Sequence, residues 1–442
     1  MVTTPTRPAA GKAAGRTPAK PSIRRSPDGS RQKTAASRPV PGNEADRSSN
    51  DRDNTLPGKL SRMWIFLEGS DRKASGSSYY LIVGATLALT AIGLMMVLSA
   101  SSVESIASGL SPYALLIKQA IYAAVGLVMM FVLSRISIRG LKRMAWPALG
   151  LSFVLLLLVF SPLGYGVGGN RNWIGVGQFS AQPSEAAKLA LALWMATVLA
   201  RKAKLIHRWK HVVIPVVPVA VLAIFLVILG RDLGTALIIM LIVAAALFFA
   251  GAPGKMFVIA ALTGAGAALI LTLTSAHRME RVANWLRGVC PIGEAGCYQS
   301  TNGLYALASG GWTGVGLGQG QQKWSWIPEA HNDFIFAIIG EELGLVGTLV
   351  VVALFGILAV AIVRVILRHD DPFVRILSGS IMVWIIGQAF VNIGMVTGLL
   401  PVIGVPLPFI SYGGSALVFA LAGIGVILAF ARKTPANVES SS

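Results

Sequence analysis

The sequence predicts an all-α polytopic membrane protein with about ten transmembrane helices, one large extracytoplasmic loop and a disordered basic N-terminal tail. The first observation is composition: 54% of the 442 residues are hydrophobic and only 13% are charged. The second is that the apolar residues form runs of about 20, the length that spans a bilayer. The net charge is +19, but the basic residues lie in the tail and in short loops, which indicates a topology signal rather than nucleic-acid binding.

Residues 1–75 precede the first apolar run and are rich in Pro, Ser, Thr, Ala, Arg and Lys. Because this segment has few large apolar residues, it cannot bury enough surface to fold, and we predict a disordered cytoplasmic tail. No apolar core follows the first charges within about 30 residues, which excludes a signal peptide. We expect the tail to fix orientation and to contact anionic membrane lipid. A docking segment for a cytoplasmic partner is the alternative.

Ten apolar runs define a transmembrane domain of residues 76–433, which a short cytoplasmic tail at 434–442 follows. The predicted helices are 79–100, 113–134, 144–163, 184–200, 212–229, 233–251, 256–275, 334–363, 373–398 and 415–431. Basic residues cluster after the second, fourth, eighth and tenth runs, whereas the loops 101–112 and 400–414 contain no Lys or Arg. Basic loops favour the cytoplasmic side, so both termini are predicted to be cytoplasmic and the 276–333 loop extracytoplasmic.

The 276–333 loop is far longer than ordinary connections, and its Trp, Tyr and Leu content argues against disorder. We therefore interpret it as the functional part of the protein. It contains both cysteines, Cys290 and Cys297, which are predicted to form a short-range disulfide on the oxidising side of the membrane; two free thiols are the alternative. The glycines of GVGLGQG (314–320) lack the context of a nucleotide site, and we predict tight turns against a neighbour or a ligand.

Ionisable residues within or beside apolar runs are costly in a membrane, so they are candidate functional residues. Glu185 and Lys188 begin the fourth run three residues apart, on one face of a helix. Asp232 lies in the short turn between the fifth and sixth runs, Asp333 opens the eighth, and Glu342 lies about two turns deeper. The predicted topology gathers these residues toward the outer leaflet. Structural ion pairing between helices is the alternative interpretation.

Two irregular stretches accompany these residues. In the Gly-rich stretch 168–191, Arg171 and Trp173 suit a lipid head group, the cation for phosphate and the ring for the interface; a simple interfacial anchor is the alternative. The stretch 392–415 ends the ninth run with three prolines. Irregular backbone at membrane depth is tolerated only where it is buried in protein or lines a cavity, so we predict that this stretch forms a wall of an outer cavity.

A resemblance to a known family is carried by GGNRNWI with QPSEAAKL (168–189), RDLGTA (231–236), ALASGGWTGVGLGQGQQKW with IPEAHNDFIFAIIGEELG (306–344) and VNIGMVTGLLPVIGVPLPFISYGGS (391–415). From about residue 79 onward the chain resembles the SEDS family, the shape, elongation, division and sporulation proteins that polymerise peptidoglycan. Its PFISYGGS ending and long basic tail are more similar to the division branch than to the elongation branch.

This resemblance implies a peptidoglycan glycosyltransferase in the bacterial cell membrane, at the division septum. The implied substrate is lipid II, an undecaprenyl-pyrophosphate-linked disaccharide pentapeptide that is polymerised into β-1,4 glycan strands. The implied partners are a class B penicillin-binding transpeptidase and other division proteins. No cofactor is required, and Mg²⁺ or Mn²⁺ is a candidate to assist the pyrophosphate. The residues expected to contact substrate are Arg171, Trp173, Glu185, Lys188, Asp232, Gln299, Lys323, His331, Glu342, Asn392, Ser411 and Tyr412.

The chain departs from the family where the catalytic base is expected. Inverting transfer needs a carboxylate that takes the proton of the acceptor 4-hydroxyl, whereas the pyrophosphate leaves as an anion and needs charge neutralisation. The family usually places Asp-Pro in the first half of the large loop, and the matching place here reads Cys290-Pro291. Glu294 is the nearest acid, and we predict that it is the base. Glu329 and Asp333 are the next candidates.

Two other functions fit a membrane protein of this kind: a flippase of the lipid-linked precursor, and a division scaffold without chemistry of its own. A transporter is expected to show repeat symmetry and binding sites near the bilayer midplane. The sequence shows no clear internal repeat, and its polar residues concentrate at one face. These features favour an enzyme.

Overall fold

The computed structural model describes residues 75–167, 169–177, 179–203, 209–273, 279, 282–283, 285–286, 295–324, 327 and 330–432. Both predicted tails lie outside this part of the chain. The helices are α2 (Ser75–Ala107), α3 (Ala114–Arg135), α4 (Ile138–Leu158), α5 (Pro183–Arg201), α6 (Trp209–Leu229), α7 (Leu233–Ala250), α8 (Gly254–Leu273), α10 (Ala295–Ser309), α11 (Ile335–Leu367), α12 (Pro372–Val396) and α13 (Gly414–Ala431). The strands are β1 (Gly164–Val167), β2 (Asn170–Val176) and β3 (Phe179–Ala181).

Each predicted apolar run overlaps a helix, and the all-α membrane fold is confirmed; α10 is the exception among the described helices, because it lies in the predicted 276–333 loop. Seven of the described helices (α2, α3, α4, α7, α11, α12 and α13) are long and apolar enough to cross a membrane. The bilayer explains the agreement, because a chain in lipid must satisfy its backbone hydrogen bonds internally. The exact number of spans stays a prediction. Helix α2 continues to Ala107, well past its predicted end at residue 100.

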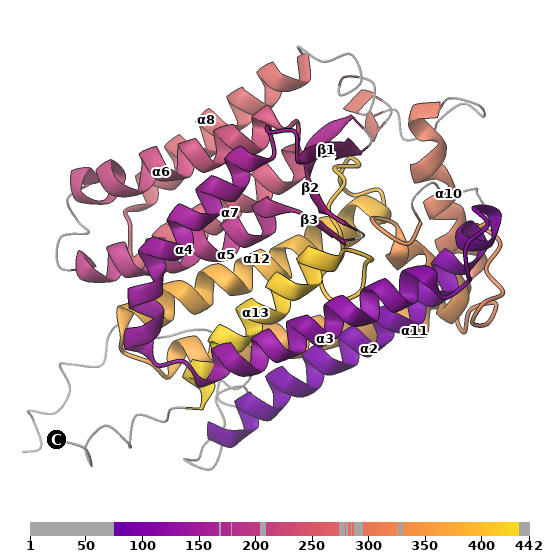
Figure 1. The fold of residues 1–442 in the computed structure, drawn as a ribbon, viewed down its shortest axis with the longest axis horizontal. Coiled ribbons are helices and arrows are strands. Elements are labelled where there is room, and N and C mark those ends of the chain that lie inside the picture. Colours follow the sequence, from indigo (N-terminus) through magenta and orange to yellow (C-terminus); the bar gives the residue numbers. More distant parts are fainter. Residues whose placement is uncertain are drawn as a thin grey trace, which may run out of the picture. The chain divides into compact units, whose positions relative to one another are not determined.

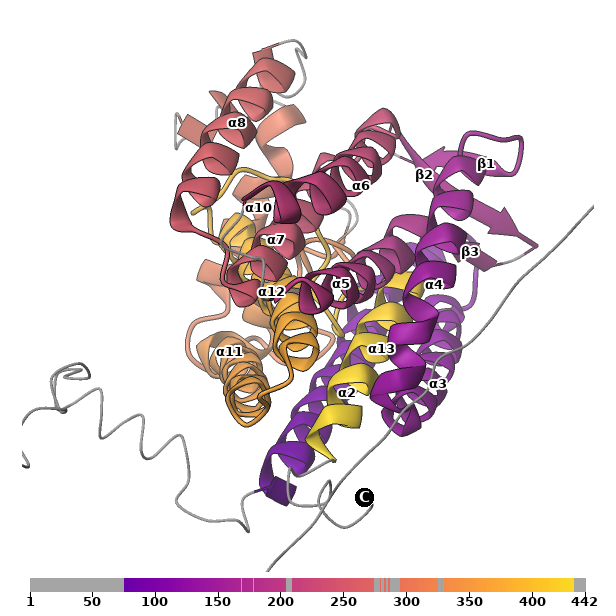
Figure 2. The same ribbon diagram turned by 90° about the vertical axis from the view of Figure 1, so that its left-hand side faces the viewer.

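Helix α13 is the central element of the bundle, and nearly all its residues are buried. It contacts α2, α3, α5, α11 and α12 (Figures 1 and 2). Glycines permit the closest of these contacts. A Cβ at Gly126 of α3 would lie 2.6 Å from Leu421, and one at Gly425 would lie 2.5 Å from the backbone of Met130. Small residues at such crossings let membrane helices approach closely.

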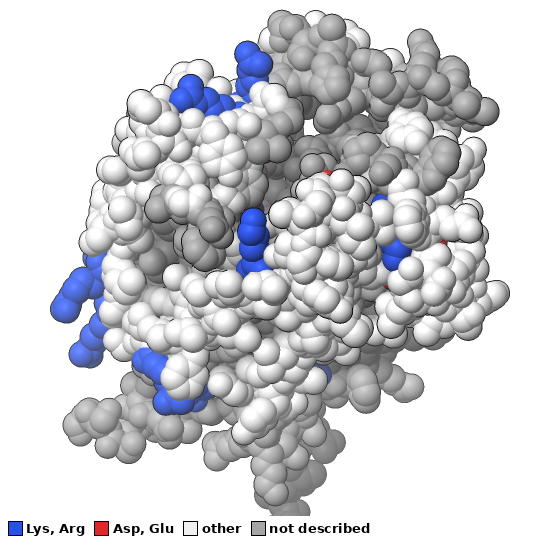
Figure 3. Space-filling model, turned by 45° about the vertical axis from the view of Figure 1, so that its right-hand side comes forward, with Lys and Arg blue, Asp and Glu red and all other residues white. Residues whose placement is uncertain are grey.

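The two ends of the bundle differ in character. The strands and α10 lie at one end (Figure 1), where α3, α5, α7, α11 and α13 begin, and we call it the loop end. The opposite, basic end carries Lys142, which contacts Asp371 at 3.2 Å and so joins α4 to α12. On the face in Figure 3, uncharged residues dominate, isolated Lys and Arg are visible, and acidic atoms hardly reach the surface.

A three-stranded antiparallel sheet, ordered β1-β2-β3, follows α4. The sequence analysis missed it and identified only a Gly-rich stretch at 168–191. Strands β1 and β3 have only 4 and 3 residues, and the sequence NRNWIGV of β2 does not alternate polar and apolar residues, the pattern that predicts a strand. Gly169 and Gly177 adopt positive φ (83° and 63°) at the two turns, a conformation that favours glycine.

Helix α11 is interrupted at Gly344, where φ is 66° and ψ is −165°. The glycine-rich segment 310–324 fills the interruption. The amides of Val315 and Gly316 donate to the carbonyls of Glu341 and Glu342, at 2.9 and 3.1 Å. Backbone groups freed by the break therefore find partners in the segment, as buried polar groups require. Gly314 adopts φ 81° against Glu342, which confirms the predicted tight turns against a neighbour.

Candidate active site

The loop between α12 and α13, residues 397–413, lies at the centre of the predicted site. Side chains satisfy its irregular backbone: Asn392 Nδ2 donates to Val405 O at 2.7 Å, and Gln388 Nε2 donates to Pro406 O at 2.9 Å. The amide of Leu407 donates to Ser411 Oγ at 2.7 Å. This loop is thus packed within protein, which is one of the settings that tolerate non-helical backbone in a membrane domain. That it forms a wall of an outer cavity stays a prediction.

Phe409 gives the same loop a strained point, since its φ is 67° and its side chain is buried. A bulky residue rarely adopts this left-handed conformation. Gly93 of α2 accommodates it, because a Cβ there would lie 2.7 Å from Ile410 Cα. On the other side, Gln119 of α3 donates to Ser411 O at 3.2 Å. Packing against α2 and α3 therefore fixes the loop in a costly conformation, which is common at functional sites.

Glu185 and Lys188 form the ion pair that their spacing predicts. Lys188 Nζ lies 2.8 Å from Glu185 Oε2, and both side chains are almost completely buried. The same ammonium donates to Gln388 Oε1 at 3.1 Å and lies 5.1 Å from the ring centroid of Trp384. Desolvated charges are stable only with such partners. Through Gln388, which also bonds the 397–413 loop, the pair joins α5 to α12.

Four hydrogen bonds converge on the carboxylate of Asp232. Oδ2 accepts from Asn172 Nδ2 and Gln182 Nε2, both at 2.9 Å, and from Thr235 Oγ1 at 2.8 Å. Oδ1 accepts from the Thr235 amide at 2.9 Å, which makes Asp232 the N-cap of α7. Asp232 thereby ties the sheet to α7. Next in the chain, Gly234 packs against the carbonyls of residues 403 and 404.

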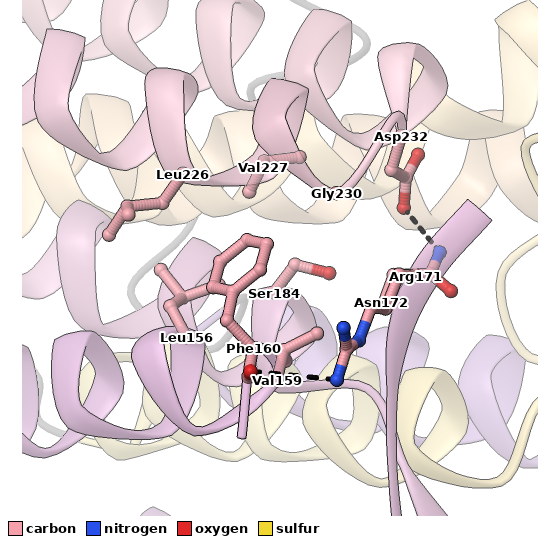
Figure 4. A pocket seen from close by; sticks show the side chains of 10 residues that line it. All are labelled: Leu156, Val159, Phe160, Arg171, Asn172, Ser184, Leu226, Val227, Gly230 and Asp232. Atoms are coloured by element: carbon pink, nitrogen blue, oxygen red, sulfur yellow. Dashed lines mark hydrogen bonds between the residues drawn. The ribbon is translucent and has the colours of Figure 1, made fainter. Parts of the chain in front are cut away.

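Arg171 and Asp232 both line a small pocket between α4, α5, α6 and the sheet, and the Arg171 guanidinium points toward Phe160 rather than toward Asp232 (Figure 4). The pocket has a volume of about 10 Å³, which is room for about one water molecule. The exposed guanidinium donates to Ser161 O at 2.9 Å. Its positive charge therefore lies at the C-terminal end of α4, where helix carbonyls favour a cation. Trp173, also predicted to bind a head group, pairs with Tyr165 across β1 and β2.

His331 and Asp333 precede α11 and contact the 397–413 loop. Asn392 Nδ2 donates to Asp333 O at 2.8 Å, and the Tyr412 amide donates to His331 O at 2.9 Å. The rings of His331 and Tyr412 meet edge to face with centroids 5.4 Å apart. His331 Nδ1 also lies 3.1 Å from Glu104 Oε2 of α2. The structure therefore brings these predicted residues together with Asn392 and Ser411.

Burial raises the pKa of the Tyr412 hydroxyl, with smaller contributions from Tyr122 and Tyr165. The hydroxyl therefore stays protonated at neutral pH and can donate a hydrogen bond to an anionic ligand. The three tyrosines belong to α3, β1 and the 397–413 loop. Tyr122 also bonds the backbone of Ser180, donating to its carbonyl at 2.9 Å.

Lys323 and Glu342 form a second buried ion pair, separate from the contacts of the 397–413 loop given above. Lys323 Nζ lies 2.8 Å from Glu342 Oε1, and the side chains are 2% and 0% exposed. Ser99 of α2 donates to both oxygens of Glu342, at 2.7 and 2.6 Å. The pair therefore fastens the glycine-rich segment to α2 and α11. The two charges neutralise each other, which supports structural ion pairing rather than substrate binding for Lys323 and Glu342.

For five of the predicted residues, the described part of the structure gives no side-chain contact that bears on the predicted role. Glu294, Glu329 and Cys290 lie outside the described residues. Cys297 and Gln299 lie in α10, a helix that the sequence analysis placed within a loop. Their predicted roles in catalysis, disulfide bonding and substrate binding stay predictions.

Sequence reasoning missed four polar residues of the site, namely Ser99, Glu104, Gln119 and Gln388. The two glutamines interrupt apolar runs and are almost completely buried, and that interruption was the available signal. Lys118, which is adjacent to Gln119, is exposed on α3. Ser99 and Glu104 had no comparable local signal, because their partners lie more than 200 residues away.

Comparison with known proteins decides the family. Residues 79–435 match the family described as "Cell cycle protein", which comprises FtsW, RodA and SpoVE. The chain belongs to this family. The resemblance to SEDS proteins is thereby confirmed, and relatives named FtsW support the division branch.

Among its relatives in this family, the "Probable peptidoglycan glycosyltransferase FtsW" of Mycobacterium tuberculosis is 42% identical over 365 residues, covering 82% of this chain and 70% of the relative. "Stage V sporulation protein E" of Bacillus subtilis is 36% identical over 357 residues, covering 80% of this chain and 96% of the relative.

Two solved structures share the fold. One comes from a peptidoglycan synthase complex described as coordinating polymerization and crosslinking; it is 28% identical, with a TM-score of 0.67, and the match covers 79% of this chain and 96% of that one. The other is the rod shape determining protein RodA of Thermus thermophilus, 28% identical with a TM-score of 0.60, with coverage of 80% and 96%.

Proposed function

We propose that this chain is a peptidoglycan glycosyltransferase that polymerises lipid II into β-1,4 glycan strands at the division septum. One observation carries the proposal: in a fold shared with peptidoglycan synthases, the buried side chains Gln119 of α3 and Gln388 and Asn392 of α12 hydrogen-bond the 397–413 loop at one end of the bundle. The Glu185–Lys188 pair of α5 joins this network through Gln388. A lipid-borne substrate presents its pyrophosphate and sugars at that depth.

The position of these residues along their helices favours an enzyme over a flippase. Glu185 lies in the first turn of α5, Asp232 caps α7, and Asn392 lies in the last turns of α12. Transporter sites lie near the bilayer midplane, whereas these residues gather at the loop end. Glycosyl transfer at the outer face of the membrane needs its hydrogen-bond donors, its cations and its catalytic base at that face, which here is the loop end.

In the proposed reaction, a loop carboxylate takes the proton of the acceptor 4-hydroxyl as this oxygen attacks the donor sugar. The bond to the pyrophosphate breaks, and the pyrophosphate leaves as an anion that positive charge and hydrogen-bond donors stabilise. Arg171, with its exposed guanidinium, and Tyr412, with its protonated hydroxyl, are the donors proposed for it. Glu294 is the proposed base, with Asp333 and Glu329 as the alternatives.

The described residues contain no group of three or more His, Cys, Asp or Glu side chains that could hold a metal ion. No step of the proposed reaction is assigned to Mg²⁺ or Mn²⁺. A divalent cation that binds together with the pyrophosphate of the substrate is a separate proposal. It is tested by comparing activity in chelator with activity in each added metal.

We place both termini in the cytoplasm and the loop end outside it, as the basic residues at the opposite end support. A class B transpeptidase with a single span is proposed to pack on α11 and α12 and to activate the enzyme through the large loop. Co-purification after detergent extraction tests this pairing. Full activity of the isolated chain, with no transpeptidase recovered, would contradict it.

The deciding experiment for the function is polymerisation of fluorescent lipid II by the purified full chain together with its transpeptidase partner. A penicillin blocks crosslinking, so that a ladder of linear glycan reports transfer alone. The proposal predicts lysozyme-sensitive polymer. Transbilayer movement of lipid II in vesicles without any polymer would favour the flippase, and neither activity would favour the scaffold.

A further inference from the structure

The glycine-rich segment 310–324 has a polar inner side. Its Lys323 is buried in the ion pair with Glu342. The amide of Gln321 donates to Glu341 Oε1 at 2.7 Å, and the amide of Gln322 lies 3.2 Å from the same oxygen. The segment is therefore held against α11 by an ion pair and hydrogen bonds to the buried side chains of Glu341 and Glu342.

Its outer side is apolar and exposed. Trp312 is 74% exposed, Leu317 52% and Val315 45%. Trp324, in the same segment, is 63% exposed. Exposed clusters of large apolar side chains mark contacts with another protein or with a membrane.

Backbone hydrogen bonds fix the level of this apolar side along α11. The amide of Leu345 donates to Gly311 O at 2.9 Å, and the amide of Val346 donates to Trp312 O at 3.2 Å. Trp312 therefore lies beside Val346. Leu345 and Val346 are themselves exposed, so the apolar surface continues from the segment onto α11.

The sequence of α11 places this level at the edge of the bilayer. From Leu345 to Val363 the helix has no charged residue, and Arg364 follows. This stretch of about 19 residues rises about 28 Å, close to the roughly 30 Å of a hydrocarbon core. With Arg364 at one boundary, Leu345 and the neighbouring Trp312 lie at the other.

We propose that the glycine-rich segment is an interfacial membrane anchor, in which Trp312, Val315 and Leu317 insert between the phospholipid head groups and the upper acyl chains. Tryptophan prefers this depth because its ring is apolar while its N–H seeks polar partners. The anchor does not depend on glycosyl transfer. It would set the height of His331 and Asp333, which follow the segment, relative to any lipid-borne head group.

Depth-dependent quenching tests the anchor in the full chain, reconstituted in phosphatidylcholine–phosphatidylglycerol nanodiscs. An environment-sensitive fluorescent amino acid replaces Trp312 or Leu317, and the exposed polar Gln319 is the matched control. We expect nitroxide lipids labelled near the head group to quench positions 312 and 317 more than lipids labelled near the chain end. Aqueous iodide should quench both positions several-fold less than position 319.

Equal iodide quenching at the three positions would overturn the anchor, since the segment would then lie in water. Shielding from both iodide and nitroxide lipid would also overturn it, by showing that protein covers the segment. A second measurement needs only Trp312→Phe. Lipids brominated near the head group should quench a smaller share of the intrinsic tryptophan emission than in the unaltered protein, and an unchanged share would contradict the proposal.

Discussion

At the residue scale, the acidic side chains of the site are stabilised in two different ways. Glu185 and Glu342 each face a buried lysine ammonium. Asp232 instead accepts hydrogen bonds from two amide side chains and from Thr235. Hydrogen-bond donors, rather than a cation, therefore stabilise the Asp232 carboxylate. These residues should therefore respond differently to replacement.

Asp232→Asn should lower stability, because an amide group cannot accept all four hydrogen bonds and leaves buried donors unpaired. A buried unpaired donor costs about 1–3 kcal/mol, so the thermal unfolding midpoint should fall in detergent or nanodiscs. Asp370→Asn is the matched control, since Asp370 is exposed at the basic end. Equal midpoints for the two variants would show that the Asp232 contacts contribute nothing measurable.

Lys188→Met should destabilise the protein by about 3–5 kcal/mol, the usual cost of leaving one buried partner unpaired. Glu185→Gln combined with Lys188→Met removes both charges and should recover much of that loss. Denaturation of the two single variants and the double variant completes the cycle. A double variant that loses the sum of the single losses would mean that the pair is not coupled.

At the element scale, the interruption of α11 holds the glycine-rich segment in place. Gly344→Ala should lower stability by more than about 1 kcal/mol, because φ is 66° there and a Cβ would meet the carbonyl of Trp312. Gly356→Ala is the control on the same helix, where a Cβ meets nothing within 4 Å. Thermal unfolding compares them, and an unaffected Gly344→Ala would indicate that α11 can straighten without cost.

Cys290 and Cys297 stay a predicted disulfide, motivated by their short spacing in a loop placed outside the cytoplasm. Maleimide labelling of intact membranes should therefore modify neither cysteine until a reductant is added. A bond over such a short loop would stabilise the protein by roughly 2–3 kcal/mol. Full labelling without reductant would show two free thiols and would leave the loop unconstrained.

The transmembrane helices could be predicted from the sequence, because the length and hydropathy of an apolar run are enough to identify them. It could not predict the sheet or the break in α11, since both depend on tertiary contacts. Local spacing predicted the Glu185–Lys188 pair. Other partners are distant in sequence: Lys323 is 19 residues from Glu342, and the side chains of Asn172 and Gln182, which bond Asp232, are 60 and 50 residues from it. No local pattern identifies such pairs.

At the scale of the whole molecule, the two ends of the bundle serve different purposes. The basic end carries the arginines and lysines expected of the cytoplasmic side. The loop end combines the sheet, the 397–413 loop and the glycine-rich segment. Buried ion pairs and hydrogen bonds hold these parts together, so the site is built on a rigid frame. The proposed base, Glu294, would act from the large loop above this frame.

Polymerisation of lipid II by Glu294→Gln tests that account most directly. The variant keeps the side-chain shape and removes the base, so glycan synthesis should fall about 10²–10⁴-fold while lipid II still binds. Asp333→Asn and Glu329→Gln are the matched controls and should retain more activity. Near-normal polymerisation by Glu294→Gln, together with its loss in either control, would contradict the account and move the base to that carboxylate.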